Sequence, residues 1–249
     1  MVNPIIEVCA NSAASCVTAE QGGAARVELC AGIPEGGTTP SYGEMVTARR
    51  AIGIQMNVII RPRGGDFLYT PAEMQAMLLD IEAAKAAGAD GVVFGCLRAD
   101  GTIDIERNRQ LKEAAGNLST TFHRAFDVCR DPFTALEEII ALGFDRILTS
   151  GQEASAPQGT ALLAELVRRA DGRIIIMPGC GVNEHNVAEL ARATGAQEFH
   201  MSARHRVESG MVYRNERVSM GGTVTVEEFA RDLTDPQRVA QSIEALRHV

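Results

Sequence analysis

The segment Arg26–Ala31, RVELCA, has the composition of a short buried strand, and seven other segments of the chain share its character. They are rich in Val and Ile, and they recur at fairly regular intervals. Short apolar runs of this kind, bounded by Gly, Pro or polar residues, predict strands. The eight segments begin near Ile5, Arg26, Met56, Gly91, Thr120, Arg146, Ile174 and Glu198.

Ala- and Leu-rich stretches with helical periodicity lie between these strands. The clearest are Pro71 to Ala87, Asp131 to Leu142 and Thr160 to Ala170. Several stretches carry helix start and stop signals. The start signals are Thr70, Asp131 and Asn183, and the glycines that end helices are Gly88, Gly143 and Gly195.

Eight strand–helix units in 249 residues predict an α/β protein with a single (β/α)8 TIM-type barrel domain over residues 1–249. A doubly wound open sheet is the alternative. The one long irregular stretch, Arg204 to Thr223, follows the eighth strand and exceeds normal loop length, so we expect a lid, an interface arm or both. A C-terminal helix is expected over about residues 225–247.

The composition is that of an ordinary globular protein, with 45% hydrophobic and 22% charged residues. A net charge of -8 argues against nucleic acid or an anionic membrane as a partner. The chain has no signal-peptide pattern and no apolar run long enough to cross a bilayer, so we expect a cytoplasmic protein. Its six cysteines form no CxxC pair, and we expect them to be reduced.

The first two strands carry the same signature, EVCA and ELCA, in which a glutamate precedes a cysteine by two residues. Strand periodicity puts Glu7 on the same face as Cys9, and Glu28 on the same face as Cys30. A carboxylate in the middle of a barrel strand must face the interior, where it needs a cation beside it.

The third and eighth strands are the expected neighbours of these carboxylates. The third strand runs into IIRPRGGDF, which contains Arg61 and Arg63, and we expect Arg61 to lie beside Glu28. Because a barrel closes, the eighth strand should bring His200 and Ser202 of EFHMSA next to the first strand.

The fifth strand ends in TTFHRAFD, which should face this arc from across the barrel mouth with His123, Arg124 and Asp127. Active sites of such barrels lie at the carboxyl ends of the strands. For a single Glu–Arg pair, an inert salt-bridge network is the better explanation. A constellation of polar residues on five strands instead predicts a site.

Two turns suggest an anion. MPGCGVNEHN contains Gly179 and Gly181 after the seventh strand, and TSGQ places Ser150 after the sixth. In barrels, such turns can present backbone N–H groups to a phosphate. A tight turn without a ligand explains the glycines equally well.

Several chemistries are disfavoured by the sequence. Lys85 and Lys112 both lie in helical segments, so no lysine on a strand could form a Schiff base. The chain lacks the HxH, HExxH and Cys2His2 spacings of high-affinity zinc sites. TSGQ does not match the GxSxG nucleophile elbow of serine hydrolases.

The chain resembles the CutC family of copper homeostasis proteins over nearly all of residues 7–215. The resemblance rests on EVCANS, RVELCAGIPEGGTTPSYG, IIRPRGGDFLYT, TFHRAFD, RILTSGQ, GCGVNEHN, EFHMSA and VYRN. It implies a TIM-like barrel, a cytoplasmic homodimer or homotetramer, and Cu(I) binding, with Cys30 and its neighbour Cys9 as the metal ligands. Cys180 departs from the family pattern, in which Gly or Ala is expected, and adds a thiol near the mouth.

Two functions compete at this point. The first is copper binding, with Cys9, Cys30, His123 and His200 as candidate ligands of Cu(I). The second is an enzyme with isomerase- or lyase-type acid–base chemistry on a small anionic or phosphorylated metabolite. Its expected catalytic residues are Glu7, Glu28, His123, His200 and Asp127, and its expected substrate-binding residues are Arg61, Arg63, Arg124, Ser150, Gly179, Gly181 and Ser202.

A lone cysteine in an apolar strand is more often a core residue than a ligand, so the thiols alone do not decide between these functions. A binding-only scaffold is the third alternative, in which the segment Arg204 to Thr223 serves oligomer assembly. The sequence leaves open whether the chain is an enzyme.

Overall fold

The computed structural model describes residues 4–215, 217, 218, 220, 227–247 and 249. Its barrel strands are β1 (Ile5–Ala10), β2 (Arg26–Leu29), β3 (Gln55–Ile59), β4 (Gly91–Phe94), β5 (Ser119–Phe122), β6 (Arg146–Thr149), β7 (Ile175–Pro178) and β8 (Glu198–Met201). The helices are α1 (Ala13–Gln21), α2 (Tyr42–Ala51), α3 (Pro71–Ala87), α4 (Ile105–Ala115), α5 (Pro132–Ala141), α6 (Thr160–Ala170), α7 (Val187–Thr194) and α8 (Pro236–Leu246), with short 3-10 turns η1 (Ile33–Glu35) and η2 (Arg124–Val128).

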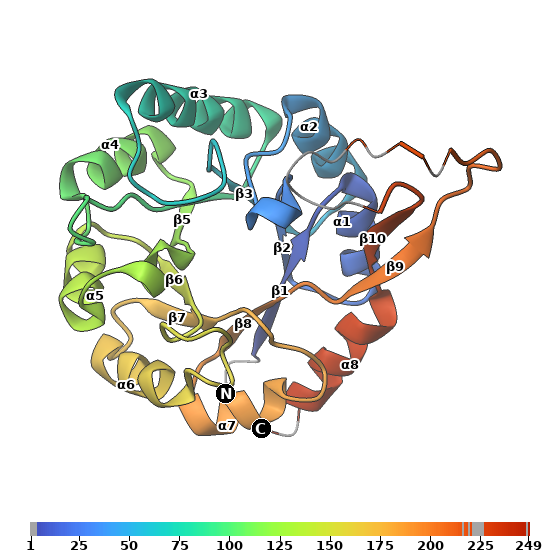
Figure 1. Cartoon of the computed structure of the whole chain (residues 1–249). Helices are drawn as coiled ribbons and strands as arrows, with labels where there is room; N and C mark the ends of the chain where they lie inside the picture. The colour runs from blue at the N-terminus through green and yellow to red at the C-terminus, as the bar shows by residue number, and fades with distance from the viewer. Residues whose placement is uncertain (1–3, 216, 219, 221–226, 248) are drawn as a thin grey trace.

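The eight strands are parallel and form one sheet in the order β7-β6-β5-β4-β3-β2-β1-β8. β8 also lies against β7, so the sheet closes into a ring that the helices surround (Figure 1). The predicted (β/α)8 barrel is therefore confirmed, and the open sheet is wrong. Among the described residues, no helix has both the length and the apolar character that a membrane span requires.

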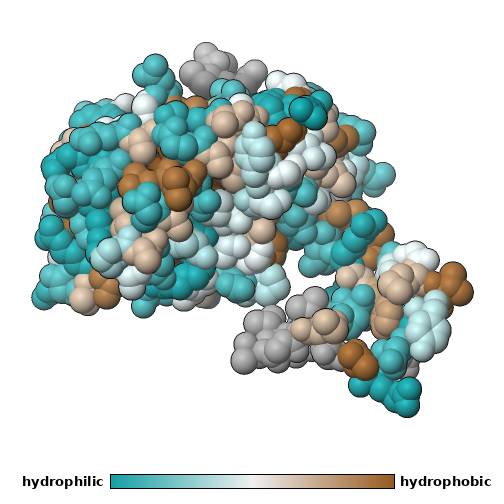
Figure 2. Space-filling model, turned by 90° about the horizontal axis from the view of Figure 1, so that it is seen from above, coloured by the Kyte–Doolittle hydropathy of each residue, from teal (hydrophilic) through white to brown (hydrophobic). Residues whose placement is uncertain are grey.

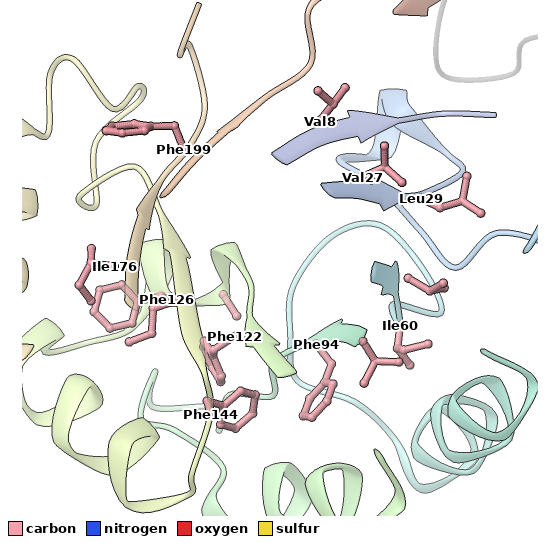
Figure 3. Close-up of a cluster of buried hydrophobic side chains, with 14 of the residues drawn as sticks. Val8, Val27, Leu29, Ile60, Phe94, Phe122, Phe126, Phe144, Ile176 and Phe199 are labelled. Carbon is pink, nitrogen blue, oxygen red and sulfur yellow. The ribbon is translucent and has the colours of Figure 1, made fainter. Parts of the chain in front are cut away.

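Strand alternation divides the apolar residues into two separate groups. Val8, Val27 and Phe199 belong to the large cluster between the sheet and the helices, of which Figure 3 shows ten labelled members. A much smaller cluster of Cys30, Ile59 and Val93 lies inside the ring. Most of the hydrophobic core thus lies outside the sheet, as expected when helices cover a barrel.

Charged side chains occupy much of the barrel interior. Arg26 on β2 forms ion pairs with Glu7 on β1 and Glu198 on β8, and Glu198 also pairs with Arg146 on β6. These four side chains are all at least nine-tenths buried. Each buried charge therefore has an opposite charge in contact, which offsets its desolvation cost.

The segment after β8 differs from the expectation. Residues Arg204–Glu208 are not irregular but form β9, which pairs antiparallel with β10 (Ala230–Thr234). This ribbon and the residues next to it project from the barrel (Figures 1 and 2). Residues 216, 219 and 221–223 of the predicted segment lie outside the described residues.

The C-terminal helix is shorter than the predicted range of about 225–247. It begins at Pro236, because residues 230–234 pair with β9 and Asp235 provides the N-cap. The helix expected after Asn183 also begins later, at Val187, because residues 184–186 form a turn. Elsewhere the start signals hold: Thr70 and Glu73 form a capping box at α3.

The interior ionic network yields a first prediction. In Arg26→Met, the buried Glu7 and Glu198 lose the cation that joins them, so we expect the free energy of unfolding to fall by about 3–5 kcal/mol. Equilibrium urea denaturation measures this change. Arg168→Met is the matched control, because Arg168 pairs with Glu165 on the surface and should contribute no more than about 1 kcal/mol. Equal effects of the two substitutions would contradict the account.

Candidate functional site

Two adjoining cavities open at the carboxyl ends of the strands. We call the first, of about 410 Å³, the thiol cavity, because Cys9 and Cys30 line it. The second, of about 290 Å³, is the arginine cavity, which Arg61 lines. Residues that line both cavities are Cys9, Glu28, Gly36, Arg124 and His200. A ligand in either cavity would therefore meet the same carboxyl and imidazole groups.

Two thiols lie together at the entrance. In the β1–β2 ladder, Cys9 is level with Glu28, and Cys30 follows Leu29 at the end of β2. The two sulfur atoms are 3.4 Å apart. Cys9, Glu28 and Cys30 each offer one atom that could bind a metal, and these three atoms all lie within 4.8 Å of one another. Such a group of atoms is close enough to share one metal ion.

The two thiols titrate in opposite directions. The hydrogen bond with Cys30 is the largest cause that holds the pKa of Cys9 well below its ordinary value; burial opposes it, and His200 and Arg204 add to it. The same hydrogen bond, together with burial, raises the pKa of Cys30. Arg204 Nη2 donates to Cys9 Sγ at 3.2 Å. Cys9 is therefore the more acidic thiol of the pair.

His200 connects two glutamates that behave differently. Its Nδ1 lies 2.8 Å from Glu7 Oε1, and its Nε2 lies 3.6 Å from Glu28 Oε2. Burial alone would lower the pKa of His200, but Glu28, Cys9 and Glu7 together raise it well above its ordinary value. Burial likewise opposes ionisation of Glu7, but Arg26 and His200 hold its pKa far below the usual range.

Glu28 is the weakly satisfied member of this cluster. Burial is the largest cause that raises its pKa to about 8; His200 lowers it, and the neighbouring Cys9 and Glu7 raise it further. Its Oε1 is closed off from solvent and has no hydrogen-bond partner among the described residues. A carboxyl group with such a pKa can give or take a proton near neutral pH.

Comparisons with known proteins identify the relatives of this barrel. The CutC family model matches residues 4–205. The chain belongs to the CutC family. It is 65% identical to a CutC family protein of Parabacteroides distasonis, over 94% of this chain and 97% of that one. It is 47% identical to a human protein named copper homeostasis protein cutC homolog, over 94% of this chain and 86% of that one.

A solved structure supports the same relationship. The crystal structure of a CutC protein from Streptococcus agalactiae superposes with a TM-score of 0.77 at 35% sequence identity. The match covers 80% of this chain and 98% of the other. The predicted resemblance to the CutC family is thus confirmed.

The structure brings most of the predicted CutC site residues together. Glu7, Glu28, His200, Cys9 and Cys30 form one contiguous cluster, as the strand alternation predicted. The other predicted residues that line the cavities are Arg61, His123, Arg124, Asp127, Gly181 and Ser202. Their individual roles stay predictions.

Asp127 has a different environment from Glu28. Its carboxylate accepts hydrogen bonds from Thr149 Oγ1 and from the backbone N–H groups of Ser150 and Gln152, and it pairs with Arg124 at 2.7 Å. These bonds hold the turn after β6 against η2. The predicted acid–base residue therefore anchors a loop, and Ser150, which is fully buried, belongs to the same anchor.

The predicted arginines need two corrections. Arg61 does not pair with Glu28, because its guanidinium donates to the backbone carbonyls of Glu35, Gly37 and Gly65. Arg63 lines neither cavity, because it turns outward to pair with Glu73 and Asp66.

The predicted glycines, Gly179 and Gly181, are explained by close packing and by backbone conformation. A Cβ on Gly179 would lie 2.4 Å from Leu148 Cδ1 and 3.2 Å from His200 Cβ, so a larger residue in this turn would crowd the Leu148 and His200 side chains. Gly181 has φ of 76°, which favours glycine, and it lines the thiol cavity. Gly179 lines neither cavity.

Two residues of the site, Arg26 and Arg204, were not predicted from the sequence. Arg26 supplies the cation that pairs with Glu7, and strand alternation with Glu28 could have indicated its inward direction. Arg204 reaches Cys9 from the start of β9, and no local sequence signal predicted this contact.

The thiol pair yields a second prediction. In Cys30→Ala, the Cys9 thiolate loses its hydrogen-bond donor, so we expect the pKa of Cys9 to rise toward the ordinary value of about 8.5. Thiolate ultraviolet absorbance as a function of pH, in a Cys180→Ala background, measures this change. Reaction of Cys9 with iodoacetamide at neutral pH should slow in parallel. An unchanged pKa would show that Cys30 does not stabilise the thiolate.

Proposed function

We propose that this CutC family protein binds Cu(I) through Cys9 and Cys30. The observation that carries the proposal is the 3.4 Å separation of the two sulfur atoms at the end of adjacent strands. Soft thiolate ligands favour Cu(I) over harder cations. The human relative's name, copper homeostasis protein cutC homolog, agrees with this choice.

The surroundings of the thiols suit a metal ion that binds as cargo. The lowered pKa of Cys9 favours its thiolate form, which is the form that binds a metal. Two thiolates and one Cu(I) carry a net negative charge. Arg204, which donates to Cys9, and His200, whose pKa is raised, supply positive charge on the same side.

The proposal extends to the cellular compartment of the protein and to its oligomeric state. Reduced thiols and Cu(I) both suit the cytoplasm, where glutathione keeps cysteines reduced. Assembly as a homodimer or homotetramer stays a prediction. The projecting part of the chain carries exposed apolar side chains that such an assembly could cover, among them Met211, Val212 and Tyr213.

Copper affinity tests the proposal. In the double variant Cys9→Ala, Cys30→Ala, we expect the Kd for Cu(I) to rise by at least about 100-fold, beyond the ten- to hundredfold effects of changes around a metal ligand. Competition with a chromophoric Cu(I) chelator under reducing, oxygen-free conditions measures the Kd. Cys180→Ala is the matched control, because that thiol lines the same cavity but bonds to the Ala154 carbonyl. Unchanged affinity in the double variant would refute the proposal.

A second candidate function is acid–base catalysis, of the isomerase or lyase type, on a small anionic or phosphorylated metabolite. Its specific support is the buried pair of Glu28 and His200, which lines both cavities and in which burial raises the pKa of Glu28 to about 8. Glu28 would be protonated below that pH and would act as an acid, and above it as a base.

Turnover by this pair has its own test. A panel of small organic acids and sugar phosphates is incubated with the protein, and products are followed by NMR. We expect any turnover to fall by about 10²–10⁴-fold in Glu28→Gln, the usual contribution of a general acid or base. The wild-type rate should change as the pH passes about 8. Turnover that survives in Glu28→Gln would assign the chemistry elsewhere.

A further inference from the structure

The arginine cavity contains buried polar side chains that the copper proposal does not use. Arg61, His123 and Arg124 line it together with the apolar side chains of Ile59, Phe67 and Leu148. Arg61 and His123 are 5% and 3% exposed. Two polar side chains are thus held away from water beside an apolar wall.

One cation that lines this cavity has no anionic partner among the residues that the structure describes. Asp127 pairs with Arg124 at 2.7 Å, His200 lies 2.8 Å from Glu7 and 3.6 Å from Glu28, and Cys9 accepts a hydrogen bond from Arg204 at 3.2 Å. Among the residues that the structure describes, Arg61 has no carboxylate within ion-pair distance. A buried cation without a counter-ion is costly, so an anion from outside the chain would be stabilised here.

Arg61 also keeps hydrogen-bonding capacity. Of its five N–H groups, three donate to backbone carbonyls, two from Nη1 and one from Nη2. Nε is buried and has no hydrogen-bond partner among the described residues, and the Tyr69 hydroxyl lies near the guanidinium group. Nε and Nη2 flank one edge of the guanidinium group, the edge that a carboxylate can meet with two parallel bonds.

His123 presents a second unused donor. Its Nδ1 accepts a hydrogen bond from Ala125 N–H, which leaves the proton of the neutral ring on Nε2. That atom is buried and has no partner among the described residues. Burial, with Arg61 nearby, lowers the pKa of His123 to about 3, so the ring stays neutral.

Phe67 connects the two donors. The Arg61 guanidinium lies 5.1 Å from the centre of the Phe67 ring, and the His123 ring centre lies 4.8 Å from it. The two groups therefore form one wall, fixed by stacking on a shared aromatic ring and by the carbonyl bonds of Arg61.

We propose that the arginine cavity binds the carboxylate of a small organic acid, which accepts hydrogen bonds from Arg61 and His123. One uncompensated positive charge matches a monoanion better than a phosphate dianion, and Ile59 and Leu148 provide an apolar surface for the carbon chain. This assignment names the substrate class of the acid–base function proposed above and rests on that function for any reaction. Binding itself rests on Arg61 and His123.

The test uses pyruvate as the probe and the reduced, full-length protein. NMR of arginine Nε–H and histidine Nε2–H groups follows the titration, and isothermal calorimetry gives the Kd. We expect saturable shifts of the Arg61 and His123 signals in the wild-type protein. The Kd should rise at least about tenfold in Arg61→Gln, the loss of one charge-assisted hydrogen bond. The wild-type shifts keep the test valid should Arg61→Gln fold poorly.

Two controls separate this proposal from the others. Arg49→Gln also removes an arginine that donates to two backbone carbonyls, at the opposite end of the barrel, and should keep the wild-type Kd. Cys180→Ala removes a thiol that lines the thiol cavity but not the arginine cavity, and it should bind pyruvate normally. Pyruvate binding without turnover would contradict the catalytic function and leave the anion site standing.

Three results would overturn the proposal. The first is that the wild-type protein binds no monocarboxylate. The second is an equal Kd in Arg61→Gln and the wild-type protein. The third is tighter binding of inorganic phosphate than of pyruvate, because that result would assign the cavity to a dianion.

Discussion

The buried ion pairs inside the barrel are the constraint on which the site depends. TIM barrels are usually filled by branched apolar side chains, but here Arg26 joins Glu7 to Glu198 in the interior. Because Arg26 holds Glu7 ionised, Glu7 can hold His200 in a fixed orientation and favour its charged form. The charge of His200 then favours the Cys9 thiolate. The chemistry at the mouth is therefore set by charges buried beneath it.

The two cavities are best understood as two sides of one polar wall. Glu28 and His200 line both, with the thiols on one side and Arg61 on the other. A Cu(I) ion bound at Cys9 and Cys30 would change the charge that an anion meets, and an anion would do the same for the metal. The copper and the anion proposals therefore describe compatible properties of one site, and each stands on different residues.

Much of the barrel, and about half of the site, could be predicted from the sequence. Alternation along short strands places Glu7, Glu28, Cys9 and Cys30 inward, because a strand has only two faces. The pairing of Arg61 could not be read this way, since its contacts depend on how two loops fold around it. Arg204 was missed for a similar reason, because its contact with Cys9 requires the ribbon of β9 and β10, which joins residues far apart in the sequence.

The central claim is that the polar mouth of this CutC family barrel presents a thiol pair to Cu(I). X-ray absorption spectroscopy at the copper edge, on protein loaded with one equivalent of Cu(I) under reducing conditions, tests it most directly. The account predicts sulfur atoms as the nearest neighbours of copper in the wild-type protein and their loss in Cys9→Ala, Cys30→Ala. Coordination by nitrogen and oxygen alone in the wild-type protein would contradict it.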